Sequence, residues 1–241
     1  MCVGRKYTAV ELEDGSVGVA LTQLPEELGC CDETGLSGAD RSNAERMLRM
    51  VADEVSGLSS TRDLFPLLTS NDPVRAAVAL ACVNAVANRE DIALLPGDIL
   101  EHLGIRPSDT VGMVGLFRPL LPGLERSAET LHVFERRGGD GLLPADKAAD
   151  VLPSCDVALI TAATIANGTI DRLLDAAVSC REVALLGAST PFLPAAFIDS
   201  PVTWLSGSVV ADRKETLRVV GEGGGRRDFN HFLRKGSICC R

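Results

Sequence analysis

Residues 156–174 read DVALITAATIANGTIDRLL, and this stretch decides the fold. Residues 157–162 form a short apolar run, which predicts a buried β-strand. After a polar turn, the apolar positions from Ile170 onward follow the spacing of an amphipathic helix. Asn167 is placed to cap that helix. A strand, a polar turn and a helix in this order are typical of a parallel sheet that helices cover.

The same pattern recurs through the second half of the chain. Predicted strands, each followed by small or polar residues, cover 111–117, 131–134, 157–162, 183–186 and 202–205. Predicted helices cover 144–151 and the stretch from Asp212, whose capping box with Glu215 opens it, to Gly221. This alternation predicts a Rossmann-like parallel-sheet domain over residues 108–241.

The first half of the chain follows a different pattern. Residues 7–12 and 17–22 flank an Asp14-Gly15 turn, which predicts a β-hairpin. A helix with apolar positions from Ala44 to Val55 follows, and Asp72-Pro73 opens a second, buried helix. We predict a small α+β domain over residues 1–107. The fold class is therefore α/β, with the α+β domain preceding the Rossmann-like one.

Composition excludes several classes of protein. Residues 1–110 hold 9 Lys and Arg against 18 Asp and Glu, which accounts for the whole net charge of −9, and aromatic residues make up only 4%. Both facts argue against nucleic acid as a partner. No run of about 18 apolar residues predicts a membrane span, and no signal peptide is evident, so we expect a cytoplasmic protein. A homodimer is expected from the general frequency of such assemblies.

Ligands of open parallel sheets bind beyond the carboxyl ends of the strands. The residues that follow the predicted strands are small or polar, which suits hydrogen bonding to a ligand. The predicted ligand-binding residues at these ends are Gly115, Glu135, Thr161, Thr164, Asn167, Gly168, Thr169, Gly187, Ser189 and Gly207. If Asn167 caps its helix, the N–H groups of Gly168 and Thr169 would face the cleft and favour an anion such as phosphate or carboxylate.

Two of the candidate polar residues allow alternative interpretations. Glu135 ends the second predicted strand, where an acid accepts hydrogen bonds from ribose hydroxyls in nucleotide sites, although it also fits a solvated strand-end charge. The sequence lacks the G-x-G-x-x-G pattern of dinucleotide sites. Asn84 lies within an apolar helix, either as an amide that clamps a loop or as one that faces an interdomain cleft.

The chain holds 8 cysteines, which we expect to be reduced thiols. The vicinal pairs Cys30-Cys31 and Cys239-Cys240 do not have the C-x-x-C spacing of zinc sites, yet adjacent thiolates can bind a soft ion such as Cu(I). Alternatively, these cysteines are thiols that lie on loops and have no function. Cys239 and Cys240, together with His231, form a candidate set of three metal ligands. The 3 histidines of the chain do not suggest a catalytic triad.

Several stretches resemble one known family in order along the chain. They are VGMVGLFRPLL (111–121), Glu135, DVALITAATIANGTIDRLL (156–174), LLGASTPFLP (185–194), LSGSVVAD (205–212), Gly223–Gly225 and, in the first half, ALACVNAVAN (79–88). The family is bacterial and archaeal, of unknown function, and described as putative heavy-metal chelation. The resemblance implies an N-terminal domain like that of enolase, a Rossmann-like domain and a site between them. On that analogy Asn84, Glu135, Thr161, Asn167, Gly168, Thr169 and Gly187 line the cleft.

Three hypotheses for function follow, and whether the protein is an enzyme stays open. The first is the binding or processing of a small anionic metabolite or a metal chelate in the interdomain cleft. The second is a transferase that uses a nucleoside cofactor such as S-adenosylmethionine, with Glu135 on the ribose. The third is a soft-metal carrier that uses the cysteine pairs.

Overall fold

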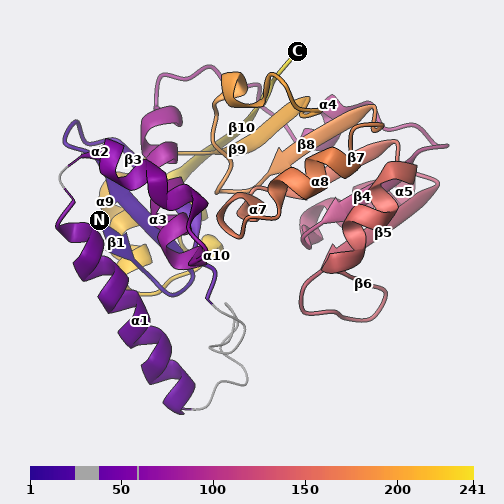
Figure 1. The fold of residues 1–241 in the computed structure, drawn as a ribbon. Coiled ribbons are helices and arrows are strands. Elements are labelled where there is room, and N and C mark those ends of the chain that lie inside the picture. The colour runs from indigo at the N-terminus through magenta and orange to yellow at the C-terminus, as the bar shows by residue number, and fades with distance from the viewer. Residues whose placement is uncertain (25–37, 59) are drawn as a thin grey trace.

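The computed structural model describes residues 1–24, 38–58 and 60–241 and has two units that meet at one edge of a large sheet (Figure 1). The first unit begins with a three-stranded antiparallel sheet in the order β1 (Cys2–Val3), β2 (Tyr7–Glu11), β3 (Val17–Leu21). The predicted hairpin is present: Gly15 has φ +83° in the turn, and Ser16 N–H donates to Asp14 Oδ1 at 2.9 Å.

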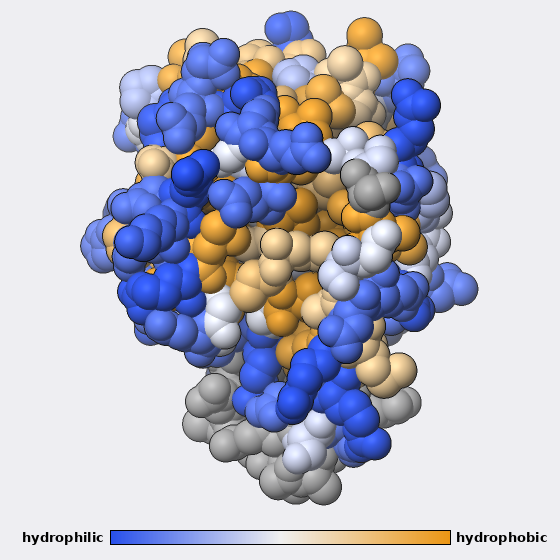
Figure 2. Space-filling view, turned by 90° about the vertical axis from the view of Figure 1, so that its left-hand side faces the viewer, coloured by the Kyte–Doolittle hydropathy of each residue, from blue (hydrophilic) through white to orange (hydrophobic). Residues whose placement is uncertain are grey.

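Helices cover one face of this small sheet. They are α1 (Gly38–Ser56), α2 (Thr61–Leu64), the 3-10 turn η2 (Phe65–Thr69) and α3 (Pro73–Ala87). The α3 helix opens as predicted, because Asp72 Oδ1 accepts the Val74 N–H at 2.9 Å. It lies so close to β3 that a Cβ at Gly18 would be 2.1 Å from Ala85 N. Figure 2 turns this side toward the viewer, with apolar side chains in its middle and hydrophilic ones around them.

The second unit is built on a seven-stranded sheet in the order β10-β9-β8-β7-β4-β5-β6. The strands are β4 (Thr110–Val114), β5 (Thr130–Glu135), β6 (Leu143–Pro144), β7 (Val157–Thr161), β8 (Glu182–Leu186), β9 (Trp204–Val210) and β10 (Leu233–Cys239). The strands from β4 to β9 are parallel, and in chain order their arrangement is the 3-2-1-4-5-6 order of a Rossmann fold. The predicted fold class is confirmed.

The edge beyond β8 differs from the prediction in two ways. The fifth strand runs to Val210, past the expected end at residue 205, and β10 pairs with it in antiparallel orientation. Gly207 therefore lies inside β9, opposite Gly236, and its predicted place in a loop after the strand was wrong. Small residues interrupted the apolar run because neighbours approach closely: a Cβ at Gly207 would be 3.0 Å from Thr190 Cβ.

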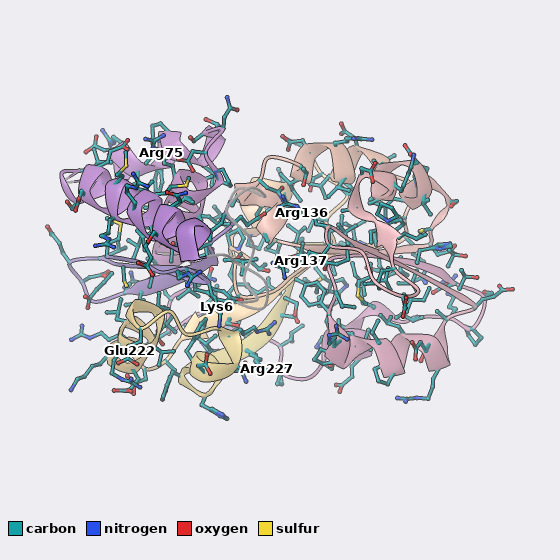
Figure 3. All side chains as sticks on the ribbon, turned by 90° about the horizontal axis from the view of Figure 1, so that it is seen from below. Lys6, Arg75, Arg136, Arg137, Glu222 and Arg227 are labelled. Carbon is teal, nitrogen blue, oxygen red and sulfur yellow. The ribbon has the colours of Figure 1, made fainter. Side chains whose placement is uncertain are left out.

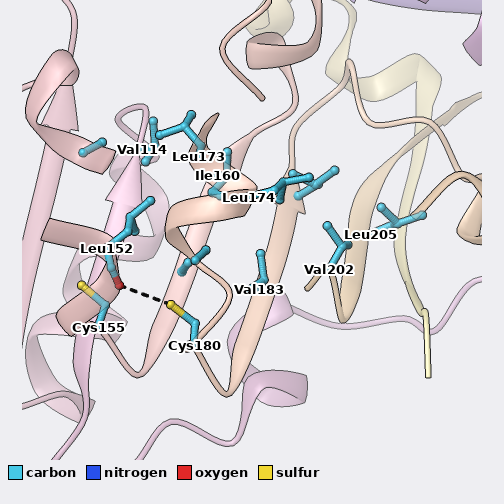
Figure 4. Close-up of a cluster of buried hydrophobic side chains, with 14 of the residues drawn as sticks. Val114, Leu152, Cys155, Ile160, Leu173, Leu174, Cys180, Val183, Val202 and Leu205 are labelled. Carbon is cyan, nitrogen blue, oxygen red and sulfur yellow. Dashed lines mark hydrogen bonds between the residues drawn. The ribbon is translucent and has the colours of Figure 1, made fainter. Parts of the chain in front are cut away.

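Short helices connect the strands and cover both faces of the large sheet. They are α4 (Ile99–Leu103), η3 (Arg118–Leu120), α5 (Leu121–Ser127), η4 (Ala145–Lys147), α6 (Ala148–Val151), η5 (Leu152–Ser154), α7 (Ala163–Ala166), α8 (Ile170–Ala176), η6 (Pro194–Phe197), α9 (Arg213–Gly221), α10 (Arg226–Phe229) and η7 (Asn230–Phe232). One core cluster contains Leu152, Ile160, Leu174, Val183 and Leu205 (Figure 4). A second cluster joins Ile99 and Leu103 to Met113, Leu124 and Leu159.

The C-terminal segment packs back onto the N-terminal sheet. In Figure 1 the yellow α9 and α10 lie beside the indigo hairpin, and α9 contacts both β1 and β2. Tyr7 and Phe229 meet edge to face, with ring centroids 4.9 Å apart. The two units thus share buried side chains, and the limits 1–107 and 108–241 remain a prediction. Within the described ranges, no helix is long and apolar enough to cross a membrane.

Candidate functional site

The carboxyl edge of the large sheet faces the N-terminal hairpin. The strand order reverses between β4 and β7, which is the point where ligands bind in sheets of this type. Gly115 follows β4 with φ +88°, and a Cβ there would be 3.0 Å from Thr161 Cβ at the end of β7. Both facts favour glycine at this turn, which packs tightly against Thr161 at the reversal point.

Glu135, at the end of β5, carries a carboxylate held in one orientation. Its Oε2 accepts the Leu116 N–H at 2.9 Å, and its Oε1 accepts the Arg136 N–H at 2.8 Å. Each carboxylate oxygen retains a further acceptor position, because an ionised carboxylate accepts about four hydrogen bonds. The half-buried Glu135 therefore presents a fixed, negatively charged acceptor beside the reversal point.

Gln23 joins three segments that are remote in sequence. Its Oε1 accepts from Arg136 Nη1 at 3.0 Å and from Asn167 Nδ2 at 3.1 Å, and its Nε2 donates to the Ala163 carbonyl. The side chain is 8% exposed. Asn167 and Glu135 are therefore on the same side of the molecule. Sequence reasoning missed Gln23, since the only available signal was a polar residue just after the hairpin.

The predicted open helix start after β7 was wrong. Thr169 N–H donates to Thr164 O at 3.0 Å and to Asn167 Oδ1 at 3.2 Å, and Gly168 N–H donates to Ile165 O at 3.3 Å. Asn167 does act as a local cap, and its Oδ1 also accepts the Thr169 hydroxyl at 2.7 Å. Because these amides already have acceptors, attraction of an anion to this edge depends on side-chain cations.

The predicted ligand-binding residues divide into two groups by exposure. Accessible residues at the carboxyl edge are Gly115, Glu135, Thr161, Asn167, Gly168, Thr169 and Gly187. Gly187 has φ +112° and lies next to the Phe117 ring, 3.8 Å from the position of a Cβ. The second group is fully buried and consists of Asn84, Thr164, Ser189 and Gly207.

Two members of the buried group, Asn84 and Ser189, hold the two units together. Asn84 Nδ2 donates to Val19 O at 2.8 Å and to Ser189 O at 3.1 Å. Ser189 Oγ in turn accepts the Leu21 N–H at 2.8 Å, so the hairpin and the loop after β8 are joined from both sides. Thr164 Oγ1 donates to Thr161 O at 2.6 Å, which fixes the turn after β7. These contacts match the clamping interpretation of Asn84.

The candidate metal ligands are not brought together. His231 precedes β10 and Cys239 ends it, and a seven-residue strand at about 3.3 Å per residue separates them by roughly 20 Å. In the described ranges, no group of three or more His, Cys, Asp and Glu residues has the arrangement of a metal site. The set of His231, Cys239 and Cys240 was therefore wrong. Cys30 and Cys31 lie outside the described residues.

Two surface cavities of about 330 Å³ each lie away from the carboxyl edge. One, at the amino edge of the sheet, is lined by residues that include Cys180, Thr203 and Cys240. The other lies between α1 and the start of α3, beside Met47 and Arg75. Burial, with a smaller effect from Cys239, raises the pKa of Cys240 to about 11, so this thiol is protonated at neutral pH.

The chain is similar to two solved structures of unknown function and to one uncharacterized protein. A structure from the DUF364 family of Desulfitobacterium hafniense matches with a TM-score of 0.76 and 23% identity, over 99% of this chain and 89% of that one. One from Pyrococcus horikoshii matches with a TM-score of 0.77 and 21% identity, over 98% and 90%. An uncharacterized protein of Methanocaldococcus jannaschii is 27% identical over 226 residues, which cover 88% of this chain and 78% of the relative.

Two family models, DUF4213 and DUF364, match residues 1–87 and 98–238, and both are described as "Putative heavy-metal chelation". Their order along the chain is the order of the two units seen in the structure. The second model alone covers more than half of the 241 residues. The chain therefore belongs to the family described as "Putative heavy-metal chelation".

Proposed function

We propose that the protein binds a small anionic metabolite or a metal chelate where the hairpin meets the carboxyl edge of the large sheet. The observation that carries this proposal is the shared Gln23 acceptor, which holds Arg136 and Asn167 beside the oriented Glu135 carboxylate. A cation, an amide and a carboxylate lie together at the carboxyl edge of the sheet. This set of groups recognises a ligand that carries both negative charge and hydrogen-bond donors.

The family description refers to metal, and the ligand that we propose carries its metal as a chelate. The described residues hold no group of protein ligands that would bind an ion directly. A chelate brings its own donor atoms and exposes its charged and polar groups to the protein. Side-chain hydrogen bonds and cations of the kind found here can recognise those groups.

The test is the identity of what copurifies with the protein. Native mass spectrometry and elemental analysis are applied to the wild type and to Glu135→Ala and Asn167→Ala, with Glu125→Ala on α5 as a control for an exposed carboxylate. We expect a ligand on the wild type and on Glu125→Ala, and its loss from the two site variants, which should still fold. Equal ligand content in all four proteins would contradict the proposal.

A nucleoside cofactor is the second candidate, and the position of Glu135 favours it. Glu135 ends the strand next to β4, where an acid contacts the ribose in Rossmann-type sites. Thermal-shift measurements with adenosine-containing cofactors test this candidate. A rise in melting temperature that Glu135→Ala abolishes supports it, and no rise with any cofactor contradicts it.

A further inference from the structure

A group of cations lies beside the proposed site, on segments that the site has not yet used. Lys6 is in the β1–β2 loop, Arg226 and Arg227 begin α10, and Lys235 is on β10. In Figure 3, Lys6, Arg136, Arg137 and Arg227 gather toward the middle of the view, whereas Arg75 and Glu222 lie toward its outer side. We call Lys6, Arg226 and Arg227 the cationic arm.

The cationic arm is continuous with Gln23. The Lys6 carbonyl accepts the Thr22 N–H at 3.0 Å, so Lys6 is paired with the residue that precedes Gln23. The Lys6 side chain runs toward the glycine loop, because its Cδ is 3.2 Å from the position of a Cβ at Gly225. Arg226 follows directly. Gln23 thus bonds to Arg136 and directly follows the residue that pairs with Lys6.

The side chains of the cationic arm form no ion pair with a described carboxylate, although Asp228 Oδ2 and Lys6 Nζ both lie within 4.0 Å of the position of a Cβ at Gly225. Over residues 1–24, 38–58 and 60–241, neither Lys6 nor Arg226, Arg227 or Lys235 has an ion pair within 4.0 Å, whereas Arg218 on the adjacent α9 is paired with Glu215 and Glu222. The nearest acid in sequence, Asp228, accepts the Gly225 N–H at 2.7 Å. Burial and the charge of Arg226 both lower the pKa of Lys235, so these cations repel one another.

Unneutralised like charges destabilise a folded protein, and they are unexpected in a chain with a net charge of −9. A bound anion would remove that cost. Lys6 and Arg226 are half-buried and stand next to Gly223–Gly225 rather than on a broad open face, which suits a small ligand. A ligand with a single anionic group, placed near Arg136, would leave the cationic arm without a counter-charge.

We propose that the ligand is a small polyanion, with one anionic group beside Arg136 and a second against Lys6, Arg226 and Arg227. This inference rests on the proposed function, and it defines the ligand class as a molecule with two or more phosphate or carboxylate groups. Gly223, with φ +79°, allows the tight turn that carries the cationic arm toward the site. A polycarboxylate chelator and a polyphosphate share this chemistry.

Calorimetric titrations at constant ionic strength test the inference. The probes are inorganic tripolyphosphate, citrate, ferric citrate and, as a monoanion, acetate. The variant Lys6→Ala/Arg227→Ala is compared with the matched control Arg62→Ala/Arg126→Ala, which removes two other cations that lack ion pairs. We expect a polyanion to bind the wild type and the control with equal affinity. It should bind the Lys6→Ala/Arg227→Ala variant at least tenfold more weakly. Acetate should bind none of the three proteins. The probe that binds best distinguishes phosphate from carboxylate chemistry.

Four results would overturn the inference, the last of them together with the proposed function. The first is equal polyanion affinity in both double variants. Any loss of affinity would then reflect the change in net charge rather than the positions of Lys6 and Arg227. The second is binding of acetate as tight as that of the polyanions. The third is a wild type that binds no polyanion but keeps a copurified ligand that Glu135→Ala loses, in which case the proposed function stands without the polyanion. If no ligand of either kind is found, both proposals fail. Circular dichroism melts confirm that each variant is folded.

Discussion

The two edges of the large sheet use polar side chains in opposite ways. At the amino edge, Asp109 is 2% exposed and bonds to Arg181 Nη2 at 2.6 Å. At the carboxyl edge, Glu135 accepts the Leu116 N–H at 2.9 Å and Arg136 donates to Gln23 Oε1 at 3.0 Å, and both side chains are more accessible than Asp109. Charged side chains are therefore buried in an ion pair at the amino edge of the sheet and accessible at its carboxyl edge.

The largest expected effect comes from breaking the amino-edge pair with Asp109→Ala. Asp109 Oδ2 also accepts the Arg106 N–H at 2.7 Å, so the variant removes an ion pair and a loop hydrogen bond at once. We expect the free energy of unfolding to fall by about 3 kcal/mol, since a buried charge partner is lost. Urea unfolding measures the change, with the exposed Asp146→Ala as control. Loss of ligand binding by the folded variant would contradict the division between the edges.

Asn84→Asp should have the next largest effect, because it breaks the clamp between the two units. The amide donates to two carbonyls, whereas a carboxylate would place negative charge against both of them. We expect a loss of about 2 kcal/mol in the free energy of unfolding. Asn43→Asp, on the exposed surface of α1, is the control and should change it by less than about 0.5 kcal/mol. Equal stability of the two variants would show that the clamp contributes nothing.

The sequence predicted the parallel strands better than it predicted the site. Apolar runs such as 157–162 mark buried strands whatever surrounds them, so β4, β5, β7 and β8 were found. β9 was not delimited because Ser206, Gly207 and Ser208 interrupt its apolar run, and β10 was not found because Arg234 and Lys235 leave it without one. Glu135 was found because strand ends are recognisable. Gln23 was not, because its bonds cross from residue 23 to residues 136 and 167.

Gln23→Ala tests the carboxyl edge and should lower the stability less than the two variants above. It removes one acceptor shared by Arg136 and Asn167 and one donor to Ala163. We expect about 1 kcal/mol of lost stability, the usual contribution of a hydrogen-bonded side chain, and a loss of ligand affinity of tenfold or more. Gln23→Glu keeps an acceptor for Arg136 but adds a negative charge beside it, so an anionic ligand should bind this variant no better than Gln23→Ala. Unchanged affinity in Gln23→Ala would remove Gln23 from the site.

The rates at which the cysteines are alkylated provide a further comparison of the two edges of the sheet. Burial raises the pKa of Cys180 to about 12 and that of Cys155 to about 11, so both remain thiols at pH 8, while Cys239 is exposed. Because thiolates are the nucleophiles, iodoacetamide should modify Cys239 in the native protein and Cys155 and Cys180 only after unfolding. Peptide mapping by mass spectrometry measures each rate. In Asp109→Ala the buried thiols should react faster, and in Gln23→Ala their rates should stay close to those of the wild type. A reversed order of rates would mean that the carboxyl edge, rather than the amino edge, holds the sheet together.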